Sequence, residues 1–370
     1  MATGEHLTDL VRDALDAFLS ERERRLADIS DDLAPVAAAA RALVSGGKRF
    51  RARFCYWGWR ATQLPDPIDP MPESEDHVGR NRVVRVAAAL ELLHAAALVH
   101  DDIIDRSAVR RGAPAAHEYF ARLHRDSGWA RDAERFGQAA ALLLGDLLLS
   151  WSDELFAIAT AEFGPTAAAA RTEFATMRAE VTLGQYLDVL EEHAWIAQSD
   201  AEAAARAQKV VIYKSAKYSV EAPLVIGALL GGADEAQVES LRRYGVPLGV
   251  AFQLRDDLLG VFGDPKVTGK PAGDDLREGK RTVLIAVARG KLPASARSLL
   301  DDLLGDPTLD DEQISMLRQT LVACGAVDRV ERAIEHSLAQ ALEVLGDARI
   351  APAAKAELRA LADAVAKRSA

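Results

Sequence analysis

The stretch Val83–Asp105, with the sequence VVRVAAALELLHAAALVHDDIID, sets the architecture of this chain. Its apolar residues recur every three or four positions, and this spacing predicts a long helix that buries one face. The helix ends in a run of carboxylates. Residues four apart lie about 40° from each other around a helix axis, so Asp101 and Asp105 share a face. Asp102 points elsewhere and is expected to support them.

Two arginines, Arg110 and Arg111, follow these carboxylates shortly beyond the predicted helix end. Carboxylate oxygens are ligands that Mg²⁺ prefers, and Mg²⁺ usually completes its shell with water and substrate phosphate. Guanidinium groups bind the remaining phosphate charge through paired hydrogen bonds. The segment is therefore predicted to hold magnesium and a diphosphate. The alternative is an acidic helix end that is closed by a basic turn and binds nothing.

A second acidic segment favours the first interpretation. Residues 252–264, FQLRDDLLGVFGD, again end an apolar helical stretch with paired aspartates, Asp256 and Asp257. Two carboxylate-bearing helices that face each other across a cavity would clamp a polyphosphate between metal ions. Gln253 lies three residues before Asp256 on the same helix face, and it offers a carbonyl oxygen that could face a carbocation.

Other segments carry candidate ligands as well. GGKRFR at 46–51 places two glycines and three cations at a predicted helix start, where backbone and cations can contact an oxyanion. His94 lies about two helical turns before Asp101, and therefore on nearly the same face. YKSAK at 213–217 lies within a predicted helix, and GQYLD at 184–188 places two polar groups close together.

In motif order, from Gly46 to Arg281, the chain resembles trans-type polyprenyl diphosphate synthases, the family of farnesyl and geranylgeranyl diphosphate synthases. It is most similar to the bacterial geranylgeranyl diphosphate synthases. The resemblance implies the isoprenoid synthase fold, trans-prenyltransferase activity and a homodimer. It implies isopentenyl diphosphate and an allylic prenyl diphosphate as substrates, with about three Mg²⁺ ions per active site when substrate is bound.

The resemblance also implies a role for each candidate side chain. The predicted metal ligands are Asp101, Asp105 and Asp256. The predicted ligands of isopentenyl diphosphate are Lys48, Arg51, His94 and Arg111. The predicted ligands of the allylic substrate are Arg110, Lys214, Gln253, Lys270 and Lys280. The predicted catalytic set is Asp101, Asp105, Lys214, Gln253 and Asp256, with Gln185 and Asp188 as supporting groups.

The chain departs from the family pattern at two positions. Ser215 stands where the family often has threonine, which keeps the hydroxyl and loses a methyl group. Gly260 stands where many members have a third aspartate in the second acidic segment. The third metal ion is therefore expected to depend mainly on Asp256, with Asp257, Asp264 or water completing its shell.

Composition and periodicity predict one all-α domain over residues 1–370. The chain is 49% hydrophobic but only 6% aromatic, and it has almost no alternating β-branched runs. We expect a single large bundle of long, mostly antiparallel helices around a central cavity, with its motifs in 46–281 and further helices in 293–370. The net charge of −11 opposes nucleic-acid binding, because phosphate backbones attract proteins with a continuous basic face.

Helical periodicity and helix breakers predict the individual elements. Helices are expected over 7–27, 83–105, 138–161, 166–194, 202–230, 235–259, 312–324 and 327–345. The first of these is expected to cover the core, or else a partner subunit. Residues 63–82 are predicted to form a surface loop, and 123–136 a loop or helix break over the site at Gly128.

The remaining features place the chain in a reducing, aqueous compartment. Cys55 and Cys324 are far apart, lack metal-ligand spacing and are predicted to be reduced and buried. The first 25 residues carry charges of both signs without an apolar core, and no uninterrupted apolar run approaches membrane-spanning length. A cytoplasmic protein without a membrane span is expected.

Product length depends on the depth of the pocket beside the first acidic segment. Ala96 and Ala97 occupy the turn before Asp101, with Leu93 one turn further back, so no aromatic side chain blocks a growing chain there. We expect geranylgeranyl diphosphate as the product. The alternatives are a farnesyl or longer product, a terpene cyclase, a noncatalytic partner of another synthase, and an all-α scaffold whose acidic helix ends are merely solvated.

Overall fold

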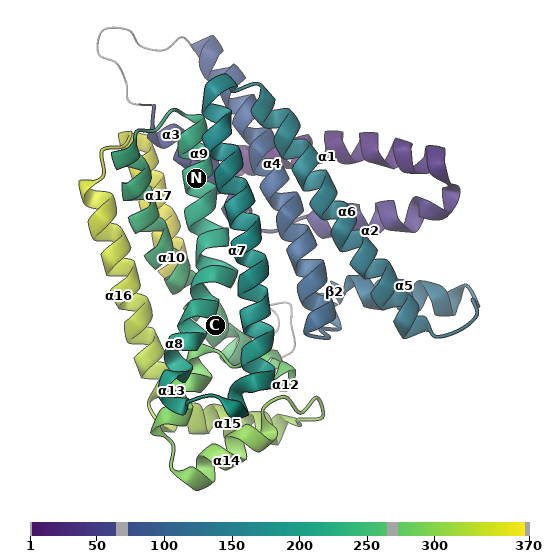
Figure 1. Cartoon of the computed structure of the whole chain (residues 1–370), viewed down its shortest axis with the longest axis vertical. Helices are drawn as coiled ribbons and strands as arrows, with labels where there is room; N and C mark the ends of the chain where they lie inside the picture. Colours follow the sequence, from purple (N-terminus) through teal and green to yellow (C-terminus); the bar gives the residue numbers. More distant parts are fainter. Residues whose placement is uncertain (1, 64–72, 265–272, 367–370) are drawn as a thin grey trace.

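The computed structural model describes residues 2–63, 73–264 and 273–366, which fold mostly into helices (Figure 1). The helices are α1 (Ala2–Ile29), α2 (Ala34–Val44), α3 (Phe50–Ala61), α4 (Glu73–Ile104), α5 (Ala116–Asp126), α6 (Ala133–Ala161), α7 (Ala167–Ala194), α8 (Ala203–Val210), α9 (Ala222–Leu230), α10 (Glu235–Phe262), α12 (Asp274–Glu278), α13 (Val283–Lys291), α14 (Ala294–Leu303), α15 (Asp311–Ala323), α16 (Ala326–Asp347) and α17 (Pro352–Ala366). The predicted all-α class is confirmed.

Short elements connect these helices. A π-helix, Val211–Glu221, joins α8 to α9. An antiparallel hairpin of β1 (Val109–Arg110) and β2 (Ala113–Pro114) follows α4, and the sequence analysis did not predict it. Single turns of 3₁₀-helix occur at Asp31–Leu33, Gly164–Thr166, Trp195–Ala197 and Asp200–Glu202.

Helix α4 lies in the core because apolar residues cover most of its faces. It packs along α3 and α6, and Ser152 of α6 donates a hydrogen bond to the carbonyl oxygen of Ala89 (2.7 Å). Its segment Val78–Ile104 is long and apolar enough to cross a membrane, although 72% of the apolar window is buried inside the molecule. A buried core helix meets the same length and composition test, because an all-round apolar helix also suits a protein interior.

The helices share one continuous apolar core. It extends from Leu7 of α1 to Val365 of α17. On α1 the buried residues Leu7, Val11 and Leu15 recur at helical spacing, so this helix covers the core as predicted. Cys55 is buried as predicted, whereas Cys324 is only half-buried, and both cysteines are free thiols.

Helix α4 begins ten residues earlier than predicted. The expected loop over 63–82 is wrong from Glu73 onward, and residues 64–72 lie outside the described part of the chain. The prolines of this segment end at Pro72, so nothing after them removes a backbone donor.

The predicted helix 202–230 is continuous but changes its pitch. Residues 211–221 form wider π-helical turns, which are rare and occur frequently at functional sites. Pro223 lacks the N–H group that would continue regular α-helical hydrogen bonding to residue 219. We attribute the wider turns before this proline to that missing donor.

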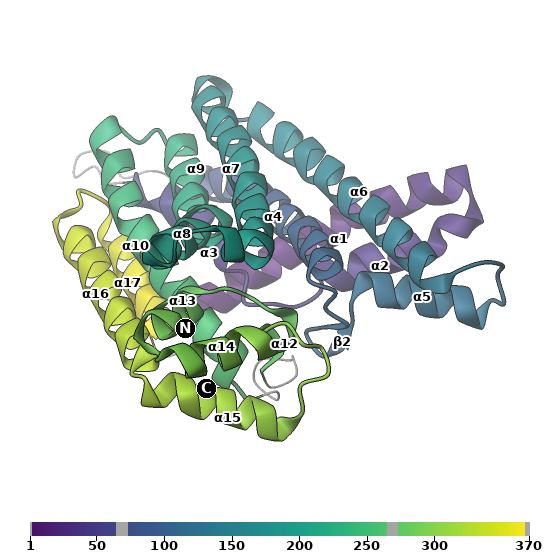
Figure 2. The same cartoon turned by 60° about the horizontal axis from the view of Figure 1, so that its bottom comes forward.

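The break at Gly128 is confirmed, but its expected position over the site is wrong. Gly128 adopts φ +64°, and Asp132 caps the start of α6 through the N–H of Arg135 (2.6 Å). The β1–β2 hairpin leads the chain from α4 into α5, which projects from the side of the bundle (Figures 1 and 2). Among the described residues, none between 112 and 180 lines the cavity of about 950 Å³ that α4 and α10 border.

Candidate active site

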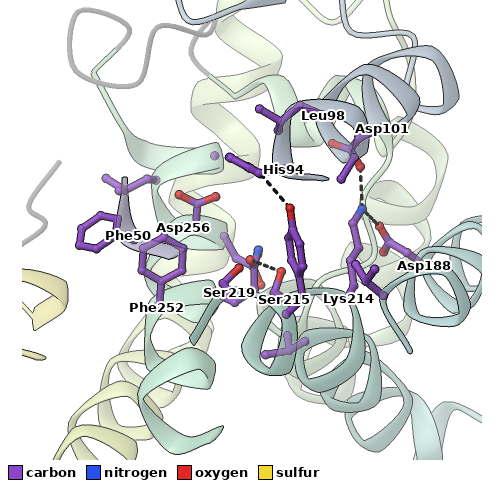
Figure 3. Close-up of a pocket in the computed structure, with 18 of the residues that line it drawn as sticks. Phe50, His94, Leu98, Asp101, Asp188, Lys214, Ser215, Ser219, Phe252 and Asp256 are labelled. Carbon is purple, nitrogen blue, oxygen red and sulfur yellow. Dashed lines mark hydrogen bonds and ion pairs between the residues drawn. The ribbon is translucent and has the colours of Figure 1, made fainter. Parts of the chain in front are cut away.

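Both acidic segments border one cavity of about 950 Å³. Asp101 comes from α4 and Asp256 from α10, and the two side chains lie on opposite sides of the cavity (Figure 3). The other predicted residues that line it are Lys48, Arg51, His94, Ala97, Arg110, Arg111, Gln185, Asp188, Lys214, Gln253, Asp257 and Lys280. Lys270 lies outside the described residues. The two acidic helices therefore share a cleft, as the sequence predicts.

Lysines neutralise two of the three aspartates of the first acidic segment, Asp101 and Asp105. Lys214 Nζ lies 2.9 Å from Asp101 Oδ1, and Lys280 Nζ lies 2.9 Å from Asp105 Oδ2. Burial alone would raise the pKa of Asp101, but the charges of Lys214, Lys280 and Arg110 outweigh it and hold that pKa below its ordinary value. The Asp105 carboxylate is only 2% exposed, and its burial raises its pKa. Unlike Asp101, Asp105 does not line the cavity itself, and it contacts Lys280, which does.

The donor set fits a magnesium ion that is completed by substrate. Carboxylate oxygens of Asp101 and Asp256 face one cavity that also contains cationic side chains. Within the described ranges, no three His, Cys, Asp or Glu side chains form a preassembled metal cluster. Mg²⁺ is commonly held by one or two carboxylates, with water and phosphate oxygens as its other ligands. The arrangement fits a metal site that substrate completes better than a site in which protein side chains supply every ligand.

Asp102 supports the site through its contact with Arg110, as predicted. Its carboxylate is 1% exposed and accepts a hydrogen bond from Arg110 Nε (2.9 Å). Arg110 Nη2 also lies 3.4 Å from Asp101 Oδ2. A buried carboxylate therefore fixes the orientation of this guanidinium beside the first acidic segment.

The GQYLD segment contacts the first acidic segment directly. Gln185 donates from Nε2 to Asp101 Oδ1 (3.2 Å), and Lys214 pairs with Asp188 as well as with Asp101 (Figure 3). A Cβ at Gly184 would lie 2.4 Å from the backbone nitrogen of Lys214. Only glycine allows α7 to approach the π-helix this closely, and the approach places Asp188 beside Lys214.

A hydrogen-bonded chain holds Gln253. The hydroxyl group of Ser215 donates to Gln253 Oε1 (2.5 Å), and Gln253 Nε2 donates to Asp257 Oδ1 (2.7 Å). The carbonyl oxygen that we expected to face a carbocation therefore already accepts one hydrogen bond. Asp257 is buried, and burial is the main reason that its pKa rises to about 8. The hydroxyl group of Ser215 therefore has Gln253 as its hydrogen-bond partner.

A buried ion pair supports the GGKRFR loop, and the sequence analysis missed it. Arg49 and Glu91 are each 5% exposed, and Arg49 Nη1 lies 3.2 Å from Glu91 Oε2. Glu91 also accepts from the backbone N–H of Ala52 (3.2 Å), at the start of α3. Arg49 additionally donates to the carbonyl oxygen of Val44. This pair holds Lys48 at the rim of the cavity.

Tyr218 is a second residue that sequence reasoning missed. Its hydroxyl lies 3.0 Å from His94 Nδ1, and the Arg51 guanidinium lies 4.2 Å from its ring centroid. Arg51 also donates to Ser219 Oγ (2.7 Å). Burial and the nearby arginines push the pKa of His94 well below its ordinary value, so the imidazole is neutral. The signal was present: Tyr218 lies four residues after Lys214, one turn along the same helix.

Comparison with known proteins agrees with this geometry. Residues 34–321 match the model of the polyprenyl synthetase family. The chain belongs to that family. It is 32% identical over 283 residues to the geranylfarnesyl diphosphate synthase of Aeropyrum pernix, covering 76% of this chain and 80% of the relative. It is 32% identical over 288 residues to a (2E,6E)-farnesyl diphosphate synthase of Mycobacterium tuberculosis, covering 77% and 73%.

Solved structures of similar chains show the same fold. A geranylgeranyl pyrophosphate synthase from Corynebacterium glutamicum, complexed with isoprenyl diphosphate and magnesium, matches with a TM-score of 0.89 and 36% identity over 99% of both chains. A polyprenyl synthase from Caulobacter crescentus, complexed with calcium and isoprenyl diphosphate, matches with a TM-score of 0.73 and 26% identity over 98% of both chains. The isoprenoid synthase fold is thereby confirmed, and this polyprenyl synthetase is a prenyltransferase.

Only one of the three predicted product-length residues of this synthetase borders the cavity. The stripe of α4 that faces the cavity consists of Glu91, His94, Ala97, Leu98 and Asp101, which follow helical spacing. Ala96 is fully buried, Leu93 is 2% exposed, and neither lines the cavity. Ala96 and Leu93 belong to the apolar core of the helices, and their role in product length stays a prediction. Leu98 takes their place in the stripe.

Proposed function

We propose that this synthetase condenses isopentenyl diphosphate with an allylic prenyl diphosphate in the described cavity, with magnesium, and releases geranylgeranyl diphosphate. The observation that carries the proposal is the pair of acidic segments on α4 and α10, which face each other across one cavity that also gathers cations. A terpene cyclase would not need the second paired aspartates, nor the cations of the GGKRFR loop.

The metal site belongs to the proposal. We assign it to Asp101, Asp105 and Asp256, with about three ions when substrate is bound. Magnesium supplies positive charge that offsets the charge developing on the diphosphate leaving group. Asp105 would first have to release Lys280, which holds it here at 2.9 Å.

The protein's own cations are assigned to the two diphosphates. Arg110, Lys214 and Lys270 bind the allylic diphosphate and stabilise it as the carbon–oxygen bond breaks heterolytically. Lys280 closes over the same group. An allylic cation is left in the apolar part of the cavity, beside Leu98 and Phe252.

The second substrate, isopentenyl diphosphate, is assigned to a separate set of side chains. Lys48, Arg51, His94 and Arg111 hold isopentenyl diphosphate so that its double bond attacks the cation, and a proton then leaves to the released diphosphate. Because the His94 pKa is low, the imidazole hydrogen-bonds to its partners without adding charge. Tyr218 orients His94 through their hydrogen bond.

A product assay tests the proposal. Purified protein is incubated with isopentenyl diphosphate, Mg²⁺ and each allylic primer in turn, and the dephosphorylated alcohols are separated by chromatography. We expect geranylgeraniol as the main alcohol. Farnesol or longer alcohols would correct the product, and no product from the chain alone would favour a noncatalytic partner subunit.

We also propose that the chain works as one domain, as a homodimer and in the cytoplasm. Large apolar side chains are exposed on α5, on α6 and on the connection between them: Tyr119, Trp129, Phe136, Leu142, Leu143 and Ile158. Exposed apolar groups gathered in one region are typical of protein interfaces. Two free thiols support a reducing compartment.

A further inference from the structure

Trp195 contacts two arginine side chains and is not one of the predicted site residues. It belongs to the 3₁₀ turn Trp195–Ala197, in the connection between α7 and α8. The guanidinium carbon of Arg281 lies 3.5 Å from its ring centroid, and that of Arg289 lies 4.8 Å away. A guanidinium over the face of tryptophan is attracted by the electron density of the ring. One ring therefore holds two cations, one from α13 and one from the segment just before it.

The connection between α7 and α8 is fixed at both ends. Arg206 of α8 donates from Nε to Glu191 of α7 (2.8 Å) and from Nη1 to the carbonyl oxygen of Ser199 (2.9 Å). Asp200 accepts a hydrogen bond from Arg289 Nη1 (2.7 Å), which ties the connection to α13. The position of the tryptophan ring is thus set by contacts with three helices.

Arg281 is offset by a carboxylate of the protein itself. Its side chain is only 9% exposed, and Nη1 donates to Asp301 Oδ1 of α14 (2.9 Å). Arg289 donates from Nε to the same oxygen (2.8 Å). A planar guanidinium that contacts both a carboxylate and an aromatic ring is held in one orientation. The charge of Arg281 thus fixes the segment that carries it.

The residue before Arg281 is Lys280, which contacts the first acidic segment. Its Nζ lies 2.9 Å from Asp105 Oδ2 and 2.9 Å from Glu278 Oε2. Both Lys280 and Arg281 line the cavity. Neighbouring residues are joined by a planar peptide unit, so an Arg281 held against Trp195 limits where Lys280 can direct its side chain.

We propose that Trp195 is a positioning residue for the allylic diphosphate: by holding Arg281, it keeps Lys280 directed into the cavity. The inference rests on the proposed function, in which Lys280 binds that diphosphate. Trp195 is not among the described residues that line the cavity, so it acts through Arg281 and does not touch substrate. Isopentenyl diphosphate, which is not assigned to Lys280, should bind independently of Trp195.

The KM values of the two substrates test this proposal. The allylic substrate is the primer with which the unaltered chain gives most product. We expect Trp195→Leu to raise its KM about tenfold, because a desolvated cation–π contact is lost, and to leave the KM of isopentenyl diphosphate within about twofold. Trp195→Phe keeps an aromatic face and should recover most of this loss. A merely structural defect would lower kcat and would not separate the two KM values.

A double variant tests whether Trp195 acts through Arg281. Arg281→Lys keeps the charge but loses the planar group, and it should raise the KM of the allylic substrate as Trp195→Leu does. Because the two residues are in contact and serve one purpose, combining both changes should cause little further loss. If Trp195→Leu does not fold, as thermal unfolding would show, Arg281→Lys alone carries the test.

Ile196→Ala is the matched control, because Ile196 lies in the same turn and is 78% exposed. Both of its KM values should equal those of the unaltered chain. A folded Trp195→Leu protein with an unchanged KM for the allylic substrate, or with an equal rise for both substrates, would overturn the proposal. If the unaltered chain made no product from any primer, the proposed function would fail, and this inference with it.

Discussion

Asp101 has several polar partners at the end of α4. It is contacted by Lys214, Gln185 and Arg110, which come from three different parts of the chain. These donors hold one carboxylate ionised beside the cavity, where a cation and a diphosphate can use it. When no metal ion is bound, Lys214 and Lys280 supply the positive charge that Asp101 and Asp105 require.

Removing the Asp101 charge should therefore abolish most of the activity while the fold remains. We expect Asp101→Asn to lower kcat by about 10²-fold or more, because a charge that acts on the developing leaving group is lost. Steady-state assays measure the loss, and circular dichroism checks the fold. Asp302→Asn, on the exposed side of α14, is the matched control and should leave kcat unchanged. Near-normal turnover in Asp101→Asn would refute the metal assignment.

Glu91 forms a buried ion pair with Arg49. Replacing it by leucine leaves the Arg49 guanidinium buried without its carboxylate. We expect Glu91→Leu to lower the free energy of unfolding by about 3–5 kcal/mol, as for other broken buried pairs. Urea denaturation measures this change. The double variant Arg49→Met/Glu91→Leu should recover part of the stability, and a single variant as stable as the parent would contradict this account.

Helix α4 carries two functions on one face. Its C-terminal end presents Asp101, while Ala97 and Leu98 of the same stripe border the apolar part of the cavity. A growing prenyl chain that starts at the diphosphates would pass this stripe. The size of the side chain at position 97 should therefore limit the length of the product.

Enlarging that side chain should shorten the product. We expect Ala97→Phe to shift the products toward chains shorter than geranylgeranyl diphosphate, because the ring would occupy the space of the last isoprene units. Chromatography of the dephosphorylated alcohols gives the distribution, and Ala97→Ser serves as a control of similar size. An unchanged distribution in Ala97→Phe would mean that the pocket floor lies elsewhere.

The π-helix Val211–Glu221 concentrates site residues on one element. Lys214, Ser215, Tyr218 and Ser219 all line the cavity from it. An α-helix advances 100° per residue, so adjacent residues diverge quickly, and wider turns change which positions face inward. The periodicity of the sequence predicted a helix here but not this pitch, because the pattern of apolar residues hardly differs between the two.

At the level of the molecule, α5 projects from the bundle (Figures 1 and 2), and exposed apolar side chains occur on α5, on α6 and on their connection. Leu142 is 51% exposed and Leu143 is 68% exposed. The cavity is lined from other helices, so this region is free to serve as an interface without blocking substrate entry. We therefore place the proposed homodimer contact here.

A charge in this region should separate the subunits. We expect Leu143→Asp to shift the protein from dimer to monomer, because the interface would have to bury an unpaired carboxylate. Light scattering coupled to size-exclusion chromatography gives the mass. Val322→Asp, at an exposed position of α15, should leave the mass unchanged. A Leu143→Asp protein that keeps the dimer mass would exclude this region as the interface.

The amino-acid order alone predicted the all-α class, most helices and the two acidic segments, because helical spacing is a local property of a few turns. It also indicated that His94 and Asp101 share a face. It did not indicate that Tyr218 binds His94, that Glu91 pairs with Arg49, or that Trp195 contacts Arg281. Those contacts join residues far apart in the chain, and only the packing of whole helices decides which of them meet.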